Sequence, residues 1–101
     1  MIVYNVTIQP TWKIHEEWLQ WMRNDHVPEI MFTGLFTHHR ILRLLDVDET
    51  DGPTYAFQYF TTGKDKYELY ISEHAKELRA KTMEKWGDQF VAFRSLMEVV
   101  E

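Results

Sequence analysis

The chain has 101 residues, of which 45% are hydrophobic and 15% aromatic, and its 11 basic and 16 acidic residues give a net charge of −5. This length fits a single domain, residues 1–101, with a sizeable core. The charge excludes a nucleic-acid partner, because nucleic-acid binders need a basic surface to displace counterions. Cysteine is absent, which excludes disulfides, zinc–thiolate sites and thiol nucleophiles.

No apolar run approaches the ~20 residues that a membrane helix needs, and the N-terminus lacks a basic segment followed by an apolar stretch. We therefore expect no membrane partner and no secretory signal. A cytoplasmic location is the expectation that follows.

The first pattern along the chain is that of a strand followed by a helix. Residues 2–9 alternate in polarity as strands do, and Pro10 ends the run. Thr11 is expected to cap a helix over residues 12–24. An apolar stripe with helical spacing continues through it and just beyond: Ile14, Trp18, Met22 and His26.

The middle of the chain predicts a short helix and a second strand. Pro28 is expected to begin a helix over residues 28–32, because its missing N–H costs nothing at a first helical position. Gly34 ends that helix. Residues 36–45 then alternate as a strand with two mixed faces.

The second half of the chain predicts a strand, a helix and a last strand. Residues 46–53 are acidic and turn-forming, and residues 54–61 are rich in the aromatic and β-branched residues that strands favour. A helical pattern runs from about Lys64 to Trp86, where Gly87 stops it. Residues 90–100 alternate again and predict the last strand.

The predicted order is strand, helix, strand, strand, helix, strand. This order is typical of the α+β ferredoxin-like fold βαββαβ, a four-stranded antiparallel sheet with both helices on one face. The other face of the sheet is then bare, although it carries apolar and aromatic side chains. We expect a second copy of the chain to cover it, giving a homodimer through the open sheet face.

Segments across nearly the whole chain resemble a family of short, uncharacterised bacterial proteins. They are MIVYNVTIQP, EEWLQWMRNDHVPEIM with TGLF after it, YAFQYF and FVAFRSLMEVV. The most distinctive part is the stretch with Trp18, Trp21 and His26-Val27-Pro28, in which the His-x-Pro is also similar to the ethyl-tert-butyl-ether-degradation type of protein.

The resemblance implies the dimeric α/β barrel superfamily. In such proteins two ferredoxin-like domains join through their bare sheet faces, and a cavity lies between sheet and helices. Small monooxygenases, lactone isomerases, polyketide cyclases and haem-processing proteins share this scaffold. It therefore implies a fold and a cavity but no particular chemistry.

His26 is the candidate catalytic residue. It lies on the stripe of Ile14, Trp18 and Met22, which directs it toward the sheet or the edge of the cavity. A histidine there titrates near neutrality and is able to donate or accept a proton. The alternative is a histidine at a helix end that is hydrogen-bonded to backbone before Pro28.

Five residues are candidates for binding a ligand. If Tyr4 and Phe57 pack beneath the helices, Asn5 and Gln58 of the same strands point to the other face. Arginine guanidiniums near these buried amides are suited to bind a carbonyl or carboxylate group. We expect Arg94 to point with Phe93 and Ser95 into the dimer interior. The alternative is a hydrogen-bonded network that closes the dimer without a ligand. The candidates are Asn5, Trp18, Arg40, Gln58 and Arg94.

Neither a metal site nor a cofactor site is predicted. His38 and His39 are adjacent, and adjacent side chains in a strand face opposite sides, so they do not chelate one ion. No glycine-rich phosphate loop, dinucleotide fingerprint or serine elbow occurs in the chain.

The sequence thus favours a homodimer that binds a small apolar or aromatic molecule in a cavity between sheet and helices. One alternative is a cofactor-free enzyme, resembling a monooxygenase or an isomerase, in which His26 moves the proton. Another is a non-catalytic interaction module whose barrel is filled by its own side chains.

Overall fold

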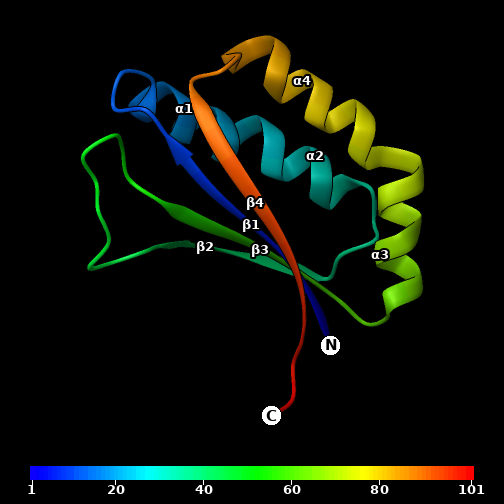
Figure 1. Cartoon of the computed structure of the whole chain (residues 1–101). Helices are drawn as coiled ribbons and strands as arrows, with labels where there is room; N and C mark the ends of the chain where they lie inside the picture. The colour runs from blue at the N-terminus through cyan, green and yellow to red at the C-terminus, as the bar shows by residue number, and fades with distance from the viewer.

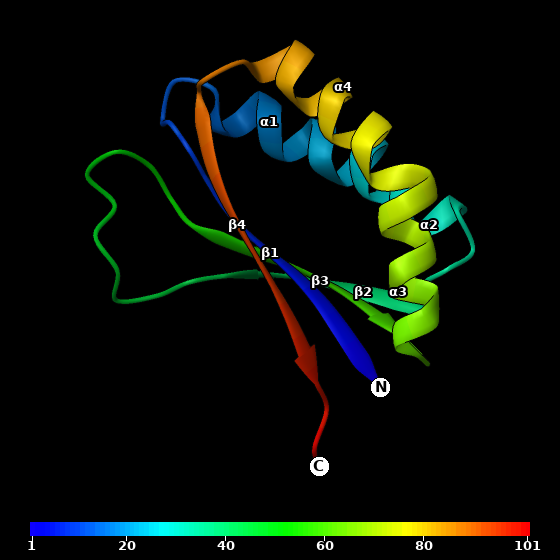
Figure 2. The same ribbon diagram turned by 45° about the vertical axis from the view of Figure 1, so that its right-hand side comes forward.

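A computed structural model describes the whole chain, Met1–Glu101, and all of its helices lie on one side of a single sheet (Figures 1 and 2). The elements in chain order are β1 (Ile2–Pro10), α1 (His15–Trp21), the π-helical turn η1 (Met22–His26), α2 (Val27–Phe32), β2 (His38–Arg43), β3 (Tyr55–Thr61), α3 (Lys64–Tyr70), the π-helical turn η2 (Ile71–Ala75), α4 (Lys76–Trp86) and β4 (Phe90–Glu98).

The sheet has four antiparallel strands in the order β2-β3-β1-β4. Because β1 and β3 are central, each is protected on both edges, whereas β2 and β4 form the outer edges. The chain begins and ends at the same end of the sheet, where β1 starts beside the end of β4 (Figure 1). This arrangement confirms the predicted α+β ferredoxin-like fold.

Strand register decides which side chains face the helices. Tyr4 lies opposite Tyr59, and Val6 lies opposite both Phe57 and Arg94. Residues directly opposite each other in antiparallel strands share a face, so these five side chains all point toward the helices. The residues between them in the same strands point to the open face.

The first helical segment is longer than the sequence pattern indicated, because it continues without a break from His15 to Phe32. The expected interruption before Pro28 is wrong. The N–H of Val27 donates to the carbonyl of Met22, five residues back, in the wide turn η1. A wider turn relieves the clash between a proline ring and the preceding turn of helix, so α2 begins with Pro28 in its first turn and no gap opens.

Thr11 does not cap that helix, contrary to expectation. The helix begins four residues later, and the Thr11 hydroxyl donates to Oε1 of Gln89 at 3.1 Å instead. Residues before the helix are held by the β2–β3 loop, since the Trp12 indole N–H donates to the Glu49 carbonyl at 2.8 Å. Gly52 of this loop lies so close to the Pro10 carbonyl that a Cβ would be 1.8 Å from the oxygen.

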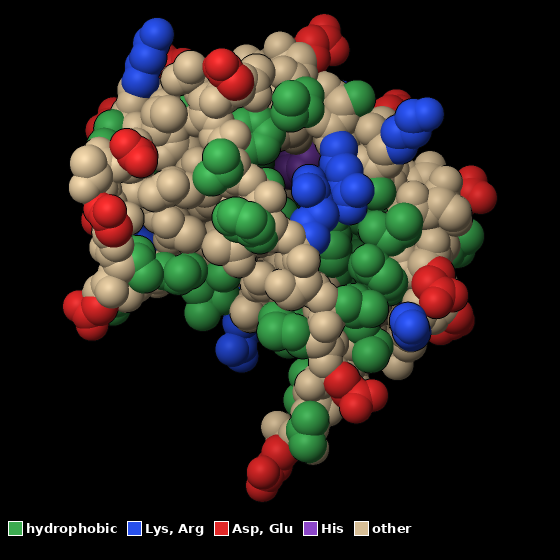
Figure 3. Space-filling view, in the orientation of Figure 1, with side chains coloured by type: hydrophobic (Ala, Val, Ile, Leu, Met, Phe, Trp, Pro, Cys, Tyr) green, Lys and Arg blue, Asp and Glu red, His purple; other side chains and the backbone are tan.

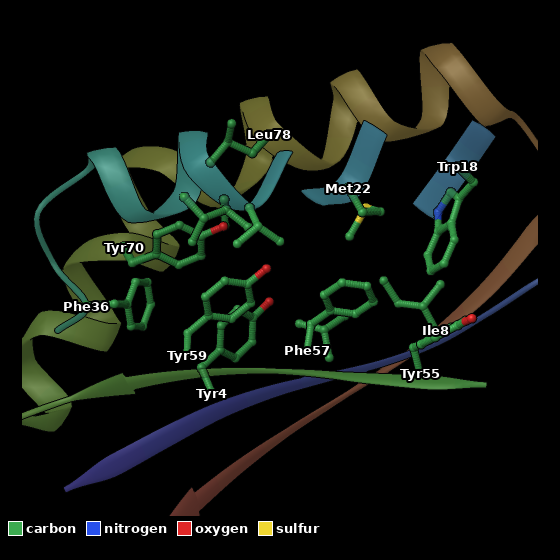
Figure 4. Close-up of a cluster of buried hydrophobic side chains, with 14 residues drawn as sticks. Tyr4, Ile8, Trp18, Met22, Phe36, Tyr55, Phe57, Tyr59, Tyr70 and Leu78 are labelled. Carbon is green, nitrogen blue, oxygen red and sulfur yellow. The ribbon is translucent and has the colours of Figure 1, made fainter. Parts of the chain in front are cut away.

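The core lies between the sheet and the helices, and aromatic side chains dominate it (Figure 4). Trp18 is fully buried and packs on Tyr55 and Phe57, with 5.7 Å between ring centroids in each pair. At the other end of the core, the ring of Tyr4 packs near those of Tyr59 and Tyr70, with 6.0 and 5.8 Å between ring centroids. Each such side chain stabilises the fold by about 1.5–3 kcal/mol through burial.

Candidate functional site

A cavity of about 370 Å³ lies between the sheet and the two helical segments. Twelve of its sixteen lining residues are hydrophobic. The sheet provides its floor, with the side chains of Tyr4, Val6, Ile8, Phe57, Tyr59 and Ala92. The helices provide its roof, including Met22, Ile30, Tyr70, Leu78 and Thr82. Its size and apolar lining are those of a small-molecule site.

The tyrosine hydroxyls give one end of this cavity a polar character. Tyr4 and Tyr59 rise from the sheet with their hydroxyls directed toward the helices (Figure 4). Burial raises the pKa of Tyr59 and of Tyr70 well above the ordinary range, and neighbouring tyrosines act in the same direction. Both phenols therefore stay protonated and neutral at every physiological pH.

His26 lies at the end of the wide turn η1 and lines the cavity. Its ring stacks on Trp21 with 5.0 Å between centroids and a 20° angle between planes. Burial lowers its pKa from 6.5 to about 4; the Glu29 carboxylate opposes this, while the charges of Arg94 and Lys81 reinforce it. The imidazole is thus neutral at pH 7.

The Nδ1 atom of His26 is buried and has no hydrogen-bond partner in the chain. The alternative, a helix-end histidine hydrogen-bonded to backbone, is therefore wrong for Nδ1. His26 also lies within a continuous helical segment and not at its end. A buried polar atom without a partner costs about 1–3 kcal/mol.

Two arginines line the same cavity as His26. Arg79, from α4, donates from Nη2 to the Tyr4 hydroxyl at 3.0 Å, while its Nε is buried without a partner. Arg94, from β4, is exposed at the rim. On this face of the molecule a recessed histidine lies beside a group of basic side chains (Figure 3).

Neither arginine has a counter-ion. The ion pairs of the chain are Arg43–Glu49, Lys64–Glu68 and Lys81–Glu29, all on exposed surfaces. Two positive charges without carboxylate partners therefore border a largely apolar cavity in a chain of net charge −5.

The structure separates the site residues expected from the sequence. His26 and Arg94 line the cavity. Asn5, Arg40 and Gln58 form one row across the open face, where Asn5 lies opposite Gln58 and Gln58 opposite Arg40. Trp18 is buried in the core beside the cavity rather than in its lining.

Arg94 points the opposite way from Phe93 and Ser95, so the expectation that it accompanies them is wrong. Arg94 lies opposite Val6, whereas Phe93 lies opposite Thr7 and Ser95 opposite Asn5. Consecutive residues of a strand alternate between faces, which puts Arg94 on the helix side. His38 and His39 likewise lie opposite Phe60 and Tyr59 and so point to opposite faces.

Sequence reasoning missed Arg79, although the chain contains a signal for it. Ala75, at the end of η2, and Leu78, Thr82 and Trp86 of α4 recur at helical spacing and lie on the inner side of this helical segment. Arg79 falls on this stripe, one turn from both Ala75 and Thr82. A charged residue on an apolar helical stripe is the signal that points to Arg79.

The fold and the cavity define a ferredoxin-like α+β protein with an internal, mainly apolar chamber. Residues 1–100 match the family described as domain of unknown function DUF4286, and the chain belongs to this family. This confirms the resemblance to an uncharacterised family. No curated protein matches the chain.

Solved structures show the same fold at low sequence identity. A dimeric ferredoxin-like protein from an uncultured marine organism is 14% identical, with a TM-score of 0.69 over 99% of this chain and 94% of that one. An ethyl tert-butyl ether degradation (EthD) family protein from Bacillus halodurans is 12% identical, with a TM-score of 0.66 over 98% and 100%. An antibiotic biosynthesis monooxygenase is 15% identical, with a TM-score of 0.64 over the full length of both chains.

None of the helices combines the length and the apolar character needed to cross a lipid bilayer.

Proposed function

We propose that this chain is a homodimeric protein that binds one small, mainly apolar or aromatic molecule per subunit in the cavity between sheet and helices. The observation that carries the proposal is the cavity itself, which is apolar over most of its wall and is also lined by His26 and by Arg79 and Arg94, neither of which has a carboxylate partner. Charges without partners beside an apolar cavity are costly, and a ligand with hydrogen-bonding groups reduces that cost.

The open sheet face supports the homodimer. Two rows across this face are largely apolar: Leu42, Ala56, Thr7 and Phe93 in one, and His38, Phe60, Val3 and Met97 in the other. Phe93 is 70% exposed there, which is unusual for so large an apolar side chain on a sheet. A two-fold axis through the face would bring the same rows together from two copies. One of the structurally similar proteins is itself described as dimeric.

The low pKa of His26 favours binding over catalysis. A general base works best when its pKa lies near the working pH, and a pKa of about 4 makes the imidazole a weak base. A neutral imidazole remains a good hydrogen-bonding group for a ligand. The enzyme alternative therefore requires a ligand that raises this pKa substantially.

The cavity volume also argues against a filled interaction module. That alternative expects aromatic side chains to occupy the interior, whereas about 370 Å³ stays open between Phe57, Met22 and Leu78. Trp18, the largest fully buried side chain, packs beside this space and does not fill it.

Native mass spectrometry of gently purified protein tests the proposal. We expect a species near twice 12.2 kDa with a reproducible additional mass for each subunit. Ala92→Phe places a ring in the cavity and should remove the additional mass, whereas Ala80→Phe, on the exposed side of α4, should retain it. A monomer contradicts the homodimer. A dimer without additional mass, or an additional mass that Ala92→Phe retains, contradicts the ligand site.

A further inference from the structure

The cavity has an electrostatic asymmetry that its apolar lining does not explain. At one side Arg79, Arg94 and His26 line the same space. These groups belong to three different elements, α4, β4 and η1. Their convergence is therefore a product of the tertiary fold and not of local sequence.

Internal partners do not account for this convergence. Arg79 uses Nη2 to donate to the Tyr4 hydroxyl, a neutral acceptor, and its Nε is buried without a partner. The nearest acidic influence on His26 comes from Glu29, but that carboxylate is already paired with Lys81 at 2.8 Å. Charged donors near an apolar cavity are stabilised when an anion forms an ion pair with them.

We propose that the molecule bound in this cavity is an apolar or aromatic monocarboxylic acid, with its carboxylate held between Arg79 and Arg94. This inference rests on the proposed function, since it names the chemical class of the ligand for the same cavity. The apolar part of the acid lies against Val6, Ile8, Phe57 and Met22.

The donor set matches a carboxylate. Its two oxygens accept from the part of the Arg79 guanidinium that Tyr4 does not occupy and from the Arg94 guanidinium, and the planar forks of these groups suit two-point recognition. His26 lines the same cavity as a neutral imidazole. A second negative charge, as on a phosphate monoester, would enter a largely apolar chamber with no further cation lining it.

The volume limits the size of the acid. A cavity of about 370 Å³ equals roughly a dozen water volumes at ~30 Å³ each. This corresponds to a ligand of on the order of ten to fifteen non-hydrogen atoms, such as a two-ring aromatic acid or a medium-chain fatty acid.

Calorimetric titration of the full-length protein with matched probes tests this class. 2-Naphthoate and 2-naphthamide have the same shape and the same number of non-hydrogen atoms, but only the first carries a charge. Decanoate and decanamide form the matching aliphatic pair. We expect the acid of at least one pair to bind on the order of tenfold to a hundredfold more tightly than its amide, because the carboxylate forms an ion pair with the guanidiniums whereas the amide offers only a neutral acceptor.

Charge-removing variants locate the effect. Arg94→Gln should weaken binding of the acid more than binding of its amide, which lowers the preference for the acid by on the order of tenfold. Arg23→Gln removes the same charge from an exposed position outside the cavity and should leave the preference intact. Arg94 is exposed and makes no hydrogen bond or ion pair in the chain, so the variant is expected to fold.

The possible failures are distinguishable. If acid and amide bind equally well, or if Arg94→Gln and Arg23→Gln reduce the preference equally, the carboxylate inference is overturned and the apolar binding site stands. If neither member of either pair binds, the proposed function fails together with this inference.

Discussion

The two faces of the sheet are built from the same four strands and differ in almost every physical respect. On the helix-covered face, Phe57 and Tyr59 are each 1% exposed and pack in a continuous aromatic core. On the open face, Phe93 is 70% exposed and polar side chains such as Asn5 and Gln58 occupy the central row. A period of two in each strand is enough to produce this contrast.

The contrast also concerns polar groups. On the open face Asn5 donates from Nδ2 to the Thr7 hydroxyl at 2.9 Å, so its amide finds a partner locally. On the covered side Nδ1 of His26 and Nε of Arg79 are buried without partners. The difference teaches that polar groups without a partner in the chain lie on the covered side, whereas exposed apolar side chains lie on the open face.

Replacing one phenylalanine on each face gives the largest expected difference. Phe57→Ala removes a ring from the core and should lower the free energy of unfolding by about 3–5 kcal/mol. Phe93→Ala should change it by less than about 0.5 kcal/mol in dilute solution, because the ring is exposed within the subunit. Urea denaturation followed by tryptophan fluorescence measures both.

Measuring the two variants at several protein concentrations makes the comparison between the faces sharper. If Phe93 lies in a dimer interface, its replacement should become more destabilising as concentration rises, since association stabilises only the folded state. The effect of Phe57→Ala should persist at every concentration. Equal costs for the two substitutions in dilute solution would contradict the difference between the faces.

Acidification should act on the covered face through His26. Its pKa is about 4 in the folded chain and 6.5 ordinarily, so between these values the unfolded state binds more protons. The contribution of the neutral His26 to the free energy of unfolding is therefore fully present above pH 6.5 and is lost as pH falls toward 4. Over that window, the loss amounts to roughly 3 kcal/mol.

The matched variants for this pH effect are His26→Gln and His39→Gln. The first removes the buried imidazole and should flatten the dependence of unfolding free energy on pH between 6.5 and 4, measured by urea denaturation at several pH values. The second changes an exposed histidine of β2 and should leave the slope as it is in the natural sequence. A slope that survives His26→Gln would assign the effect to other groups.

Most of the fold was predictable because strand and helix periods are local properties of the chain. Alternation in β1 and β3 put Tyr4 and Phe57 under the helices and Asn5 on the other face, as the register shows. The continuity of helix through Pro28 was not predictable from period alone. It depends on the wide turn η1, in which the hydrogen-bond ladder shifts by one residue.

The site was less predictable, because it is assembled from elements far apart in the chain. The position of His26 on an apolar helical stripe indicated that it faces the sheet or the cavity. The side of the sheet on which Arg94 lies follows from strict alternation along β4, which the prediction for Arg94 did not apply. Arg79 is 75 residues from the Tyr4 hydroxyl that it contacts. No local pattern indicates such a contact, which arises only when α4 packs over the sheet.

The smallest expected effect concerns an aromatic pair on the open face. His38 stacks on Phe60 across β2 and β3, with 4.3 Å between centroids and 7° between planes. Because both rings lie near solvent, a double-mutant cycle with His38→Ala and Phe60→Ala should give a coupling of only about 0.5–1 kcal/mol in dilute solution. The buried pair of Trp18 and Phe57, truncated in the same way, should lose far more from each single substitution. A coupling for His38 and Phe60 well above this range would mean that the open face is already covered when the protein is dilute, and hence that the subunits associate tightly.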